Sequence, residues 1–515
     1  MIDRFICSAL LALVLFGATA RAQGGEAPPP PEPPQNAPAE IPPAAQAPTP
    51  PPAVTAPVAV VPAAPAATWG AVSIGSAWFD RAPYSLSLGQ GDQKWVLTFY
   101  GFVEADYIAD TTRSYNDAIG SALVARSITY DGTVGRTQFT MRNTRVGLAF
   151  QSPAVGSTRP SAVIEGDFFG SQTPPPTGSE NNYFDSPVFR IRHAYLKLES
   201  PAVDILAGQT YDVFGWQNYF FPMSAEFLGL PNMVFSRNTQ FRLSRGFGAA
   251  AGPVTVDVAV EAGRPAQRDS QVPDFDAGVR LSLNNWKGIT TPGNVRTVAL
   301  PASIGVSGVV RQFKVNAFTP PPTQTSNNAT GWGVSVDLLL PVIPVADVND
   351  RGNALTLTGS AVIGTGIADL LTTGGGAQFP TLPNPMQASP PPPYAGNIDN
   401  GLVTFDVPGV LHTIDWRAFR GGLQYYLPPT GRLIFAANLT YAHSPNMKKL
   451  FPQGGAEIEL LGAVADTSIY GDANLFWDAT PAVRFGISGQ YTKVQYLDGE
   501  SPHNLRGMGQ ALYVF

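Results

Sequence analysis

The chain has 515 residues and a net charge of −6 at pH 7, and only 14% of its residues are charged. A typical soluble protein has about 25% charged residues, so this chain is unusually poor in charge. Its mild acidity excludes the basic surface of a nucleic-acid-binding protein, and we expect no nucleic-acid partner. Its one cysteine, Cys7, excludes a disulfide framework.

Residues 1–22 are typical of a cleaved secretory signal peptide. Arg4 precedes an apolar run that ends at Ala18, and the sequence ARA at 20–22 supplies an A-x-A cleavage pattern. The apolar run is too short for a transmembrane helix, and no run of about 20 apolar residues follows it. Low charge without such a helix indicates either an apolar secreted β-protein or a membrane β-barrel.

Residues 23–68 are rich in proline and alanine and contain no lysine or arginine. Such a segment cannot bury a core and favours extended polyproline II, so we predict a disordered periplasmic linker. The alternative is a tether that contacts peptidoglycan or a periplasmic protein. Residues 69–94 form a lead-in of uncertain structure.

From residue 95 to residue 515 the pattern is that of strands. Many are about ten residues long, which is the length that a tilted strand needs to cross a membrane. We predict sixteen strands, at residues 95–106, 137–150, 159–170, 187–199, 202–211, 237–248, 254–264, 274–284, 301–315, 330–340, 353–364, 411–427, 431–443, 466–478, 482–493 and 506–515.

The connections between these strands alternate between long and short. Long loops at one end and short turns at the other are typical of an outer-membrane barrel, and a soluble sandwich has no reason to alternate in this way. Two expected short turns, at 285–300 and 341–352, are longer than the pattern predicts. The chain ends in LRGMGQALYVF, where Tyr513 and Phe515 share one face of the last strand, as an outer-membrane assembly signal does.

The stretch FRIRHAYLKLES at 189–200 carries two arginines at alternate positions. Arg190 and Arg192 therefore share one face of the strand, and Phe189 and Ile191 share the other. In a barrel the apolar face meets lipid and the arginines face the lumen. The alternation reverses toward the end of the strand, so either a β-bulge shifts the phase or this part packs against a neighbouring subunit.

Two preceding strands place further charges in the lumen. Arg142 and Arg145 are three positions apart, so both can face inward only across a bulge, and Arg142 is the preferred lumen residue. Glu165 and Asp167 share a face and are expected near Arg142 and Arg190. These charges either form ion pairs that stiffen the wall or create a transverse field that acts on solutes.

The third long loop, at 212–236, is unusually apolar and aromatic, with Phe214, Trp216, Tyr219, Phe220, Phe221, Phe227 and Leu228. An exposed loop would not carry so many large apolar side chains, so the loop should be buried. In sixteen-stranded porins the third loop folds into the barrel and narrows the channel, which is the arrangement we expect. The alternative is a loop packed at a subunit interface on the outer rim.

The motifs FRIRHAYLKL, ILAGQTYDVFGW and SRNTQFRLS resemble those of the DcaP-like porins and, more distantly, of the phosphate-selective porins. The resemblance covers about 95–515 and implies a homotrimeric sixteen-stranded channel for small anionic solutes. By matching position it implies constriction roles for Arg190, Arg192, Tyr211, Asp212 and Arg242. The proline-rich segment replaces a helical oligomerising segment, and no lysine ladder typical of phosphate selectivity is present.

We therefore predict an all-β outer-membrane porin: a sixteen-stranded antiparallel barrel with an inward-folded third loop, preceded by a disordered Pro-rich segment. The four histidines form no metal-binding motif, and no G-x-S-x-G nucleophile appears, so we expect neither a cofactor nor an enzyme. Two alternatives stay open: a structural protein that tethers the membrane to the wall through a closed barrel, and a barrel hydrolase.

Overall fold

The computed structural model describes residues 84–120, 122–173, 177–217, 219–249, 252–265, 270–316, 326–372, 401–405, 410–450 and 464–515. The predicted signal peptide, the predicted linker and most of the lead-in lie outside these residues, and they stay predictions.

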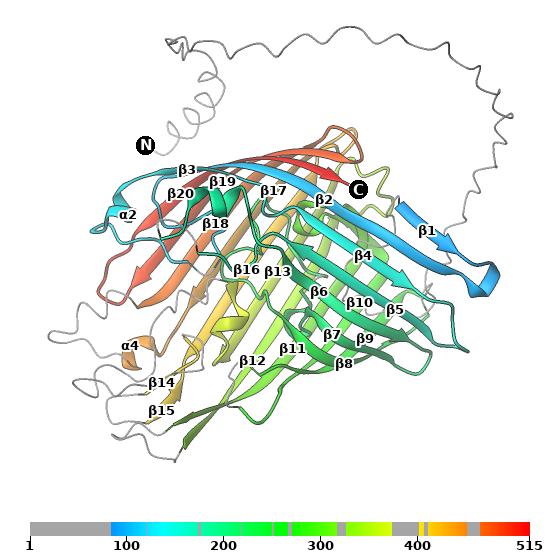
Figure 1. The fold of residues 1–515 in the computed structure, drawn as a ribbon, viewed down its shortest axis with the longest axis horizontal. Coiled ribbons are helices and arrows are strands. Elements are labelled where there is room, and N and C mark those ends of the chain that lie inside the picture. Colours follow the sequence, from blue (N-terminus) through cyan, green and yellow to red (C-terminus); the bar gives the residue numbers. More distant parts are fainter. Residues whose placement is uncertain are drawn as a thin grey trace, which may run out of the picture. The chain divides into compact units, whose positions relative to one another are not determined.

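Sixteen antiparallel strands form a closed barrel, as the sequence predicted (Figure 1). One of them is interrupted, because β3 and β4 pair with the two halves of the same strand, β2. The strands are β2 Trp95–Asp110, β3 Arg136–Thr140 with β4 Arg145–Gln151, β5 Arg159–Asp167, β6 Arg190–Glu199, β7 Asp204–Tyr211, β8 Arg237–Phe247, β9 Val254–Gly263, β10 Asp274–Thr290, β11 Val298–Asn316, β12 Ser326–Ile343, β13 Ala354–Thr365, β16 Asp415–Tyr426, β17 Leu433–His443, β18 Ala465–Asp478, β19 Val483–Tyr496 and β20 His503–Val514.

The remaining elements are short. They are strand β1 Tyr84–Leu88, which pairs with the start of β2, the hairpin of β14 Val403–Phe405 and β15 Leu411–Thr413, the α-helices α2 Tyr130–Thr133, α3 Glu180–Phe184 and α4 Met447–Leu450, and the 3-10 turns η2 Gly91–Gln93, η3 Phe214–Trp216, η4 Pro292–Asn294 and η5 Ala368–Leu370. None of the helices among the described residues is long and apolar enough to cross a membrane.

The barrel closes where β20 pairs with β2, from Phe102 opposite Val514 to Asp110 opposite Arg506. Closure leaves no free strand edge along the wall, which a strand in lipid requires. The two connections that seemed too long are partly strand, since β10 continues to Thr290 and β12 to Ile343. The turns that remain there are residues 291–297 and 344–353.

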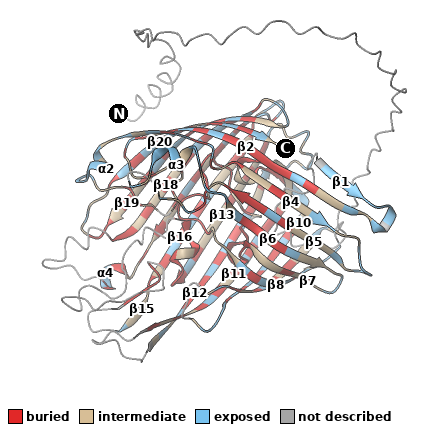
Figure 2. Cartoon of the chain, in the orientation of Figure 1, coloured by how far each residue is buried: buried red, intermediate tan, exposed pale blue. Residues whose placement is uncertain are grey.

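The wall is apolar outside and polar inside, the reverse of a soluble protein. Buried and exposed residues alternate along its strands (Figure 2). Along β10 buried and exposed residues alternate: Asp274, Asp276 and Arg280 face inward, and Phe275 and Val279 face outward. Similar outward residues on the other strands complete an apolar belt. A belt of this kind is the surface that a barrel presents to lipid.

We expect a charge in this belt to destabilise the barrel. Leu439 lies near the middle of β17 with 63% of its surface exposed, so Leu439→Arg should cost about 2–4 kcal/mol of unfolding free energy in lipid vesicles, measured by urea titration. The control is Val155→Arg, at a short turn where 73% of Val155 is exposed, with an expected effect within about 0.5 kcal/mol. Equal costs for the two variants would contradict a lipid-facing belt.

Candidate functional site

The third long loop, L3 (residues 212–236), enters the lumen directly after β7. Its first backbone amides bond to inward-facing side chains of the wall: the N–H of Val213 donates to Glu261 at 3.0 Å, and that of Gly215 to Ser307 at 2.8 Å. Phe214 and Trp216 are almost fully buried at this point. The polar wall thus supplies the hydrogen-bond partners that a buried loop needs.

L3 then reaches a second part of the wall, formed by β17 and β18. The side-chain amide of Asn438 donates to the carbonyl of Met223 at 2.9 Å, and the N–H of Ala225 donates to Asn474 at 3.2 Å. The loop is therefore bonded to strands on both sides of the lumen. The predicted inward fold is confirmed, and the alternative placement at the outer rim is excluded.

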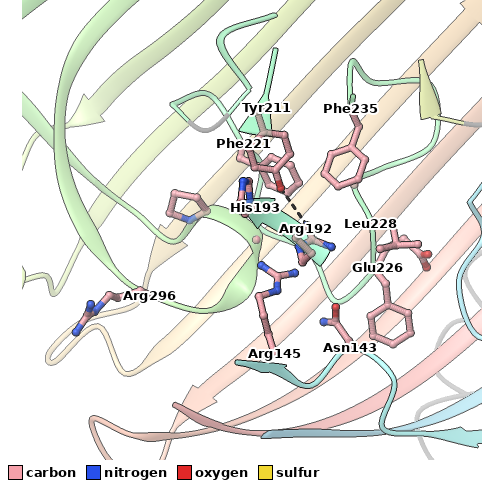
Figure 3. Close-up of a pocket in the computed structure, with 14 residues that line it drawn as sticks. Asn143, Arg145, Arg192, His193, Tyr211, Phe221, Glu226, Leu228, Phe235 and Arg296 are labelled. Carbon is pink, nitrogen blue, oxygen red and sulfur yellow. Dashed lines mark hydrogen bonds between the residues drawn. The ribbon is translucent and has the colours of Figure 1, made fainter. Parts of the chain in front are cut away.

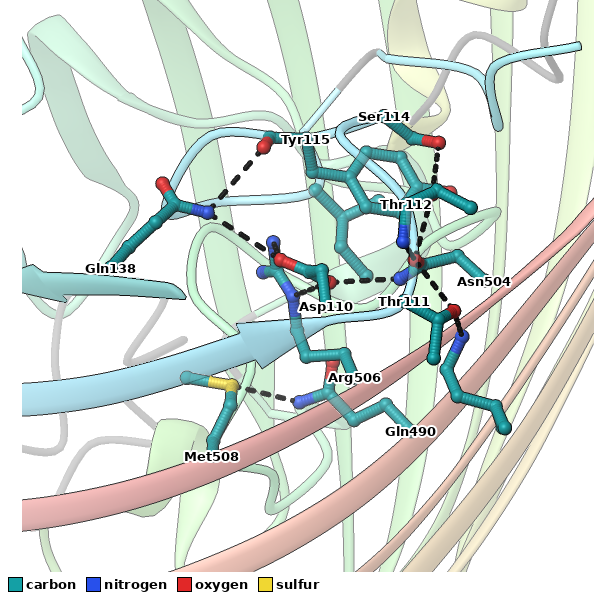
Figure 4. Close-up of polar contacts among 12 residues, drawn as sticks. Asp110, Thr111, Thr112, Ser114, Tyr115, Gln138, Gln490, Asn504, Arg506 and Met508 are labelled. Atoms are coloured by element: carbon teal, nitrogen blue, oxygen red, sulfur yellow. Dashed lines mark hydrogen bonds and ion pairs between the residues drawn. The ribbon is translucent and has the colours of Figure 1, made fainter. Parts of the chain in front are cut away.

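The first long loop, L1 (residues 111–135), also folds inward, which the sequence analysis did not predict. Arg506 on β20 forms an ion pair with Asp110 at 2.9 Å (Figure 4). Arg506 also donates to the carbonyls of Asn116 and Asp117, which holds this part of L1 against the wall. The N–H of Ile119 donates to Glu226 of L3 at 3.0 Å. L1 carries its own signal, the run Leu123–Val124, which is buried.

A β-bulge in β6 resolves the phase change that the sequence showed. On β5, the consecutive residues Glu165 and Gly166 pair with His193 and Ile191, so Arg192 has no partner residue of its own. Arg192 and His193 both point inward and are buried. The bulge was one of the two explanations offered by the sequence, and it is the correct one.

The charges of β5 and β6 form one ion-pair cluster. Asp167 lies 2.8 Å from Arg190 and 2.6 Å from Arg192, and both Asp167 and Arg192 are almost fully buried. Glu165 Oε1 lies 3.5 Å from Arg145 and 3.6 Å from Arg192. The carboxylates hold these guanidinium groups in fixed positions.

Tyr211 belongs to the same cluster, because its hydroxyl accepts a hydrogen bond from Arg192 at 3.1 Å. The other predicted residues lie apart from it. Arg142 pairs with Asp117 of L1 at 2.8 Å, and Arg242 pairs with Glu261 at 2.9 Å. The Asp212 carboxylate accepts a hydrogen bond from Ser236, and burial together with the nearby Glu261 carboxylate raises the pKa of Asp212 above its usual value.

A cavity of about 70 Å³ lies between this wall and L3 (Figure 3). Its wall side is formed by Arg145, Arg192, His193 and Tyr211. Its other sides are formed by L3 and by a turn from the short-turn end of the barrel. L3 contributes Phe221, Glu226, Phe227, Leu228, Gly229 and Phe235. The turn contributes Pro292, Gly293 and Arg296, and Asn143 completes the lining.

Of the predicted residues, the cavity is lined by Arg192 and Tyr211, with Glu165, Asp167 and Arg190 bonded behind them. Arg145, which the sequence analysis ranked below Arg142, is the arginine of β4 that reaches the cavity. Residues 141–144 interrupt the strand, so both arginines can face inward. Arg296 was missed; its only signal was the unexplained length of the connection at 285–300.

Among the described residues, three arginines and one carboxylate line the cavity. That carboxylate, Glu226, is paired with Arg506 at 3.4 Å, and burial raises its pKa to about 7. Near neutral pH the group therefore carries only part of its negative charge. The balance of charge around the cavity is positive, although the whole chain is negative.

Removal of the Asp167 carboxylate should destabilise the barrel strongly. In Asp167→Ala two arginines lose their shared acceptor while one of them stays buried, and breaking a buried pair costs about 3–5 kcal/mol. Glu180→Ala is the control, since Glu180 pairs with Arg136 at a site where its own side chain is 63% exposed; we expect less than about 1 kcal/mol. The unfolding free energy of each variant is measured by denaturant titration in detergent. Similar losses in Asp167→Ala and Glu180→Ala would contradict a buried ion-pair network around Asp167.

Stability should fall as the pH rises through 7, and Glu226 should contribute to that fall. Its pKa is about 7 in the folded protein and about 4.3 in an unfolded chain, so protonated Glu226 favours the fold. This contribution is complete below the unfolded-state pKa and is lost above the folded-state pKa. Glu226→Gln cannot ionise and should lose less unfolding free energy between about pH 5 and pH 8 than the wild type. An unchanged pH dependence in the variant would refute this assignment.

No protein-family model and no curated protein matches the sequence. Among solved structures, the chain is similar to the outer membrane channel DcaP of Acinetobacter baumannii, with a TM-score of 0.57 and 19% identity over 84% of this chain and 100% of that one. OmpF of Salmonella typhi matches with a TM-score of 0.46 and 10% identity, over 84% of this chain and 100% of that one.

An anion-selective porin from Comamonas acidovorans matches with a TM-score of 0.43 and 8% identity, over 82% of this chain and 100% of that one. With TM-scores below 0.5, the matches to OmpF and to this porin do not establish a shared fold. The likeness to DcaP shows a shared fold, and at that level it confirms the resemblance that the sequence motifs predicted. The chain has the fold of an outer-membrane channel.

Proposed function

We propose that the protein is a porin of the Gram-negative outer membrane, through which small hydrophilic solutes diffuse passively, with a modest preference for anions. The observation that carries the proposal is the cavity beside L3, which three arginines line inside a lipid-facing barrel. Solutes enter between the long loops, pass the arginine wall and leave at the short-turn end.

The arginines favour anions because a guanidinium group stays charged at all physiological pH values and can bind two oxygens of one carboxylate or phosphate group at once. Arg145 and Arg192 share Glu165, so part of their charge is balanced inside the wall. Binding to a partly balanced cluster is weak, and a channel needs weak binding so that solutes leave again. This pairing supports a modest preference rather than tight capture.

The proposed assembly is a homotrimer embedded in outer-membrane lipid, with residues 23–68 as a periplasmic linker that could reach peptidoglycan or a periplasmic protein. We propose neither a cofactor nor an enzymatic activity. Within the described part of the chain, no group of three His, Cys, Asp or Glu side chains could hold a metal ion.

The first test is conductance in a planar bilayer. Purified protein under a salt gradient should give stepwise conductance and a reversal potential on the anion side, and steps in groups of three would support a trimer. A correctly folded barrel that does not conduct would overturn the proposal. Envelope defects on deletion of 23–68 would then favour the structural tether, and cleavage of lipid or peptide substrates would favour a hydrolase.

Arg145→Gln and Arg192→Gln should each move the reversal potential toward the cation side, because each removes a positive charge from the cavity and leaves Glu165 less balanced. Arg242→Gln is the control, matched in burial to Arg192: its guanidinium is paired with Glu261, but it does not line the cavity. Equal shifts in all three variants, or none in the first two, would refute the role of the cavity arginines.

A further inference from the structure

The turn between β10 and β11, which we name the inward turn (residues 291–297), folds into the lumen from the short-turn end. Short turns of a barrel ordinarily stay outside the lumen. Here Gly293 and Asn294 both adopt a left-handed backbone, with φ of 60° each, and the turn reverses sharply. Asn294 and Val295 are buried.

Four contacts join the inward turn to strands far along the barrel. The N–H of Thr291 donates to Gln424 on β16 at 2.8 Å, and the Thr291 hydroxyl lies 2.6 Å from that of Tyr426. Asn294 bonds through its side chain to Gln510 on β20, and its carbonyl accepts from Arg484 on β19 at 3.1 Å. The turn therefore extends across the lumen and is held at its far side.

The inward turn also supports L3. The N–H of Gly293 donates to the carbonyl of Pro222 at 3.0 Å. A methyl group added at Gly293 would lie 3.7 Å from the ring of Phe221, so the turn and the aromatic side of L3 are in close packing. Two segments thus narrow the lumen, one from each end of the barrel.

Arg296 lines the cavity that Arg145 and Arg192 line from the wall. In Figure 3 its side chain lies apart from those two and extends away from them. A solute that moves on from the wall arginines past the inward turn therefore meets a further arginine, on a second element. Fixed positive charge along a passage favours anions.

We propose that the inward turn is a second constriction in series with L3, and that Arg296 is a specificity-determining residue for small anions at the short-turn side of the passage. This inference rests on the proposed channel function. An anion that has passed the wall arginines meets Arg296 before it leaves the barrel, so the charge at position 296 sets part of the selectivity.

Charge substitution by a thiol reagent tests the proposal. Cys7 is the one cysteine of the sequence and lies in the predicted signal peptide, so Arg296→Cys would carry the only thiol of the mature protein. A negatively charged methanethiosulfonate reagent should lower the single-channel conductance and shift the reversal potential toward the cation side. A positively charged reagent of similar size should lower the conductance and restore the anion preference.

Arg432→Cys is the matched control. Arg432 lies in the turn between β16 and β17 at the same end of the barrel and is exposed to solvent. Modification there should change neither the conductance nor the reversal potential. Arg296→Lys keeps the positive charge and should retain the anion preference of the wild type. That result would attribute a loss of anion preference in Arg296→Cys to the missing charge and not to altered folding.

Reagents of opposite charge that shift the reversal potential of Arg296→Cys equally, or a response no larger than that of Arg432→Cys, would overturn the inference. If the wild type conducts with an anion preference and the Arg296→Cys variant does not respond to the reagents, the inference about Arg296 is wrong and the proposed channel function still holds. A wild type that does not conduct would remove the proposed function itself.

Discussion

The whole structure depends on one constraint: inside lipid, every backbone N–H and C=O group needs a partner within the chain. The pairing of β20 with β2 meets that constraint by leaving no strand edge open along the wall. A closed wall in lipid must present apolar side chains outward, and the alternation of a strand then places every second residue inside. The polar interior of this barrel follows from that geometry.

The interior polar groups in turn build the constriction. Glu261 and Ser307 accept backbone amides of L3, and Glu226 of L3 accepts an amide of L1, so the loops replace water as partners of the wall. Asp167 and Glu165 fix the arginines that remain beside the passage. A guanidinium held in this way keeps its remaining charge at one position in the lumen.

The strands could be predicted from the sequence because residue alternation and loop length are local signals. L3 was found by its aromatic residues. The reversal of the alternation indicated the bulge at Arg192 as one of two explanations. Alternation gives the face of a residue but not its neighbours: Arg142 faces inward as predicted but pairs with Asp117 of L1, away from the cavity. Arg242, which the family resemblance placed at the constriction, pairs with Glu261 instead. The inward turn was missed because its path depends on contacts such as that of Thr291 with Tyr426, 135 positions away.

L3 has a mechanical consequence as well. The wall of the barrel is a single layer of strands. L3 is bonded to β9–β11 at one end and to β17 and β18 further along, so it acts as a strut across the cross-section. A strut keeps opposite parts of the wall at constant separation. L3 thus adds bonds across the lumen to the interstrand hydrogen bonds that hold the wall at its width.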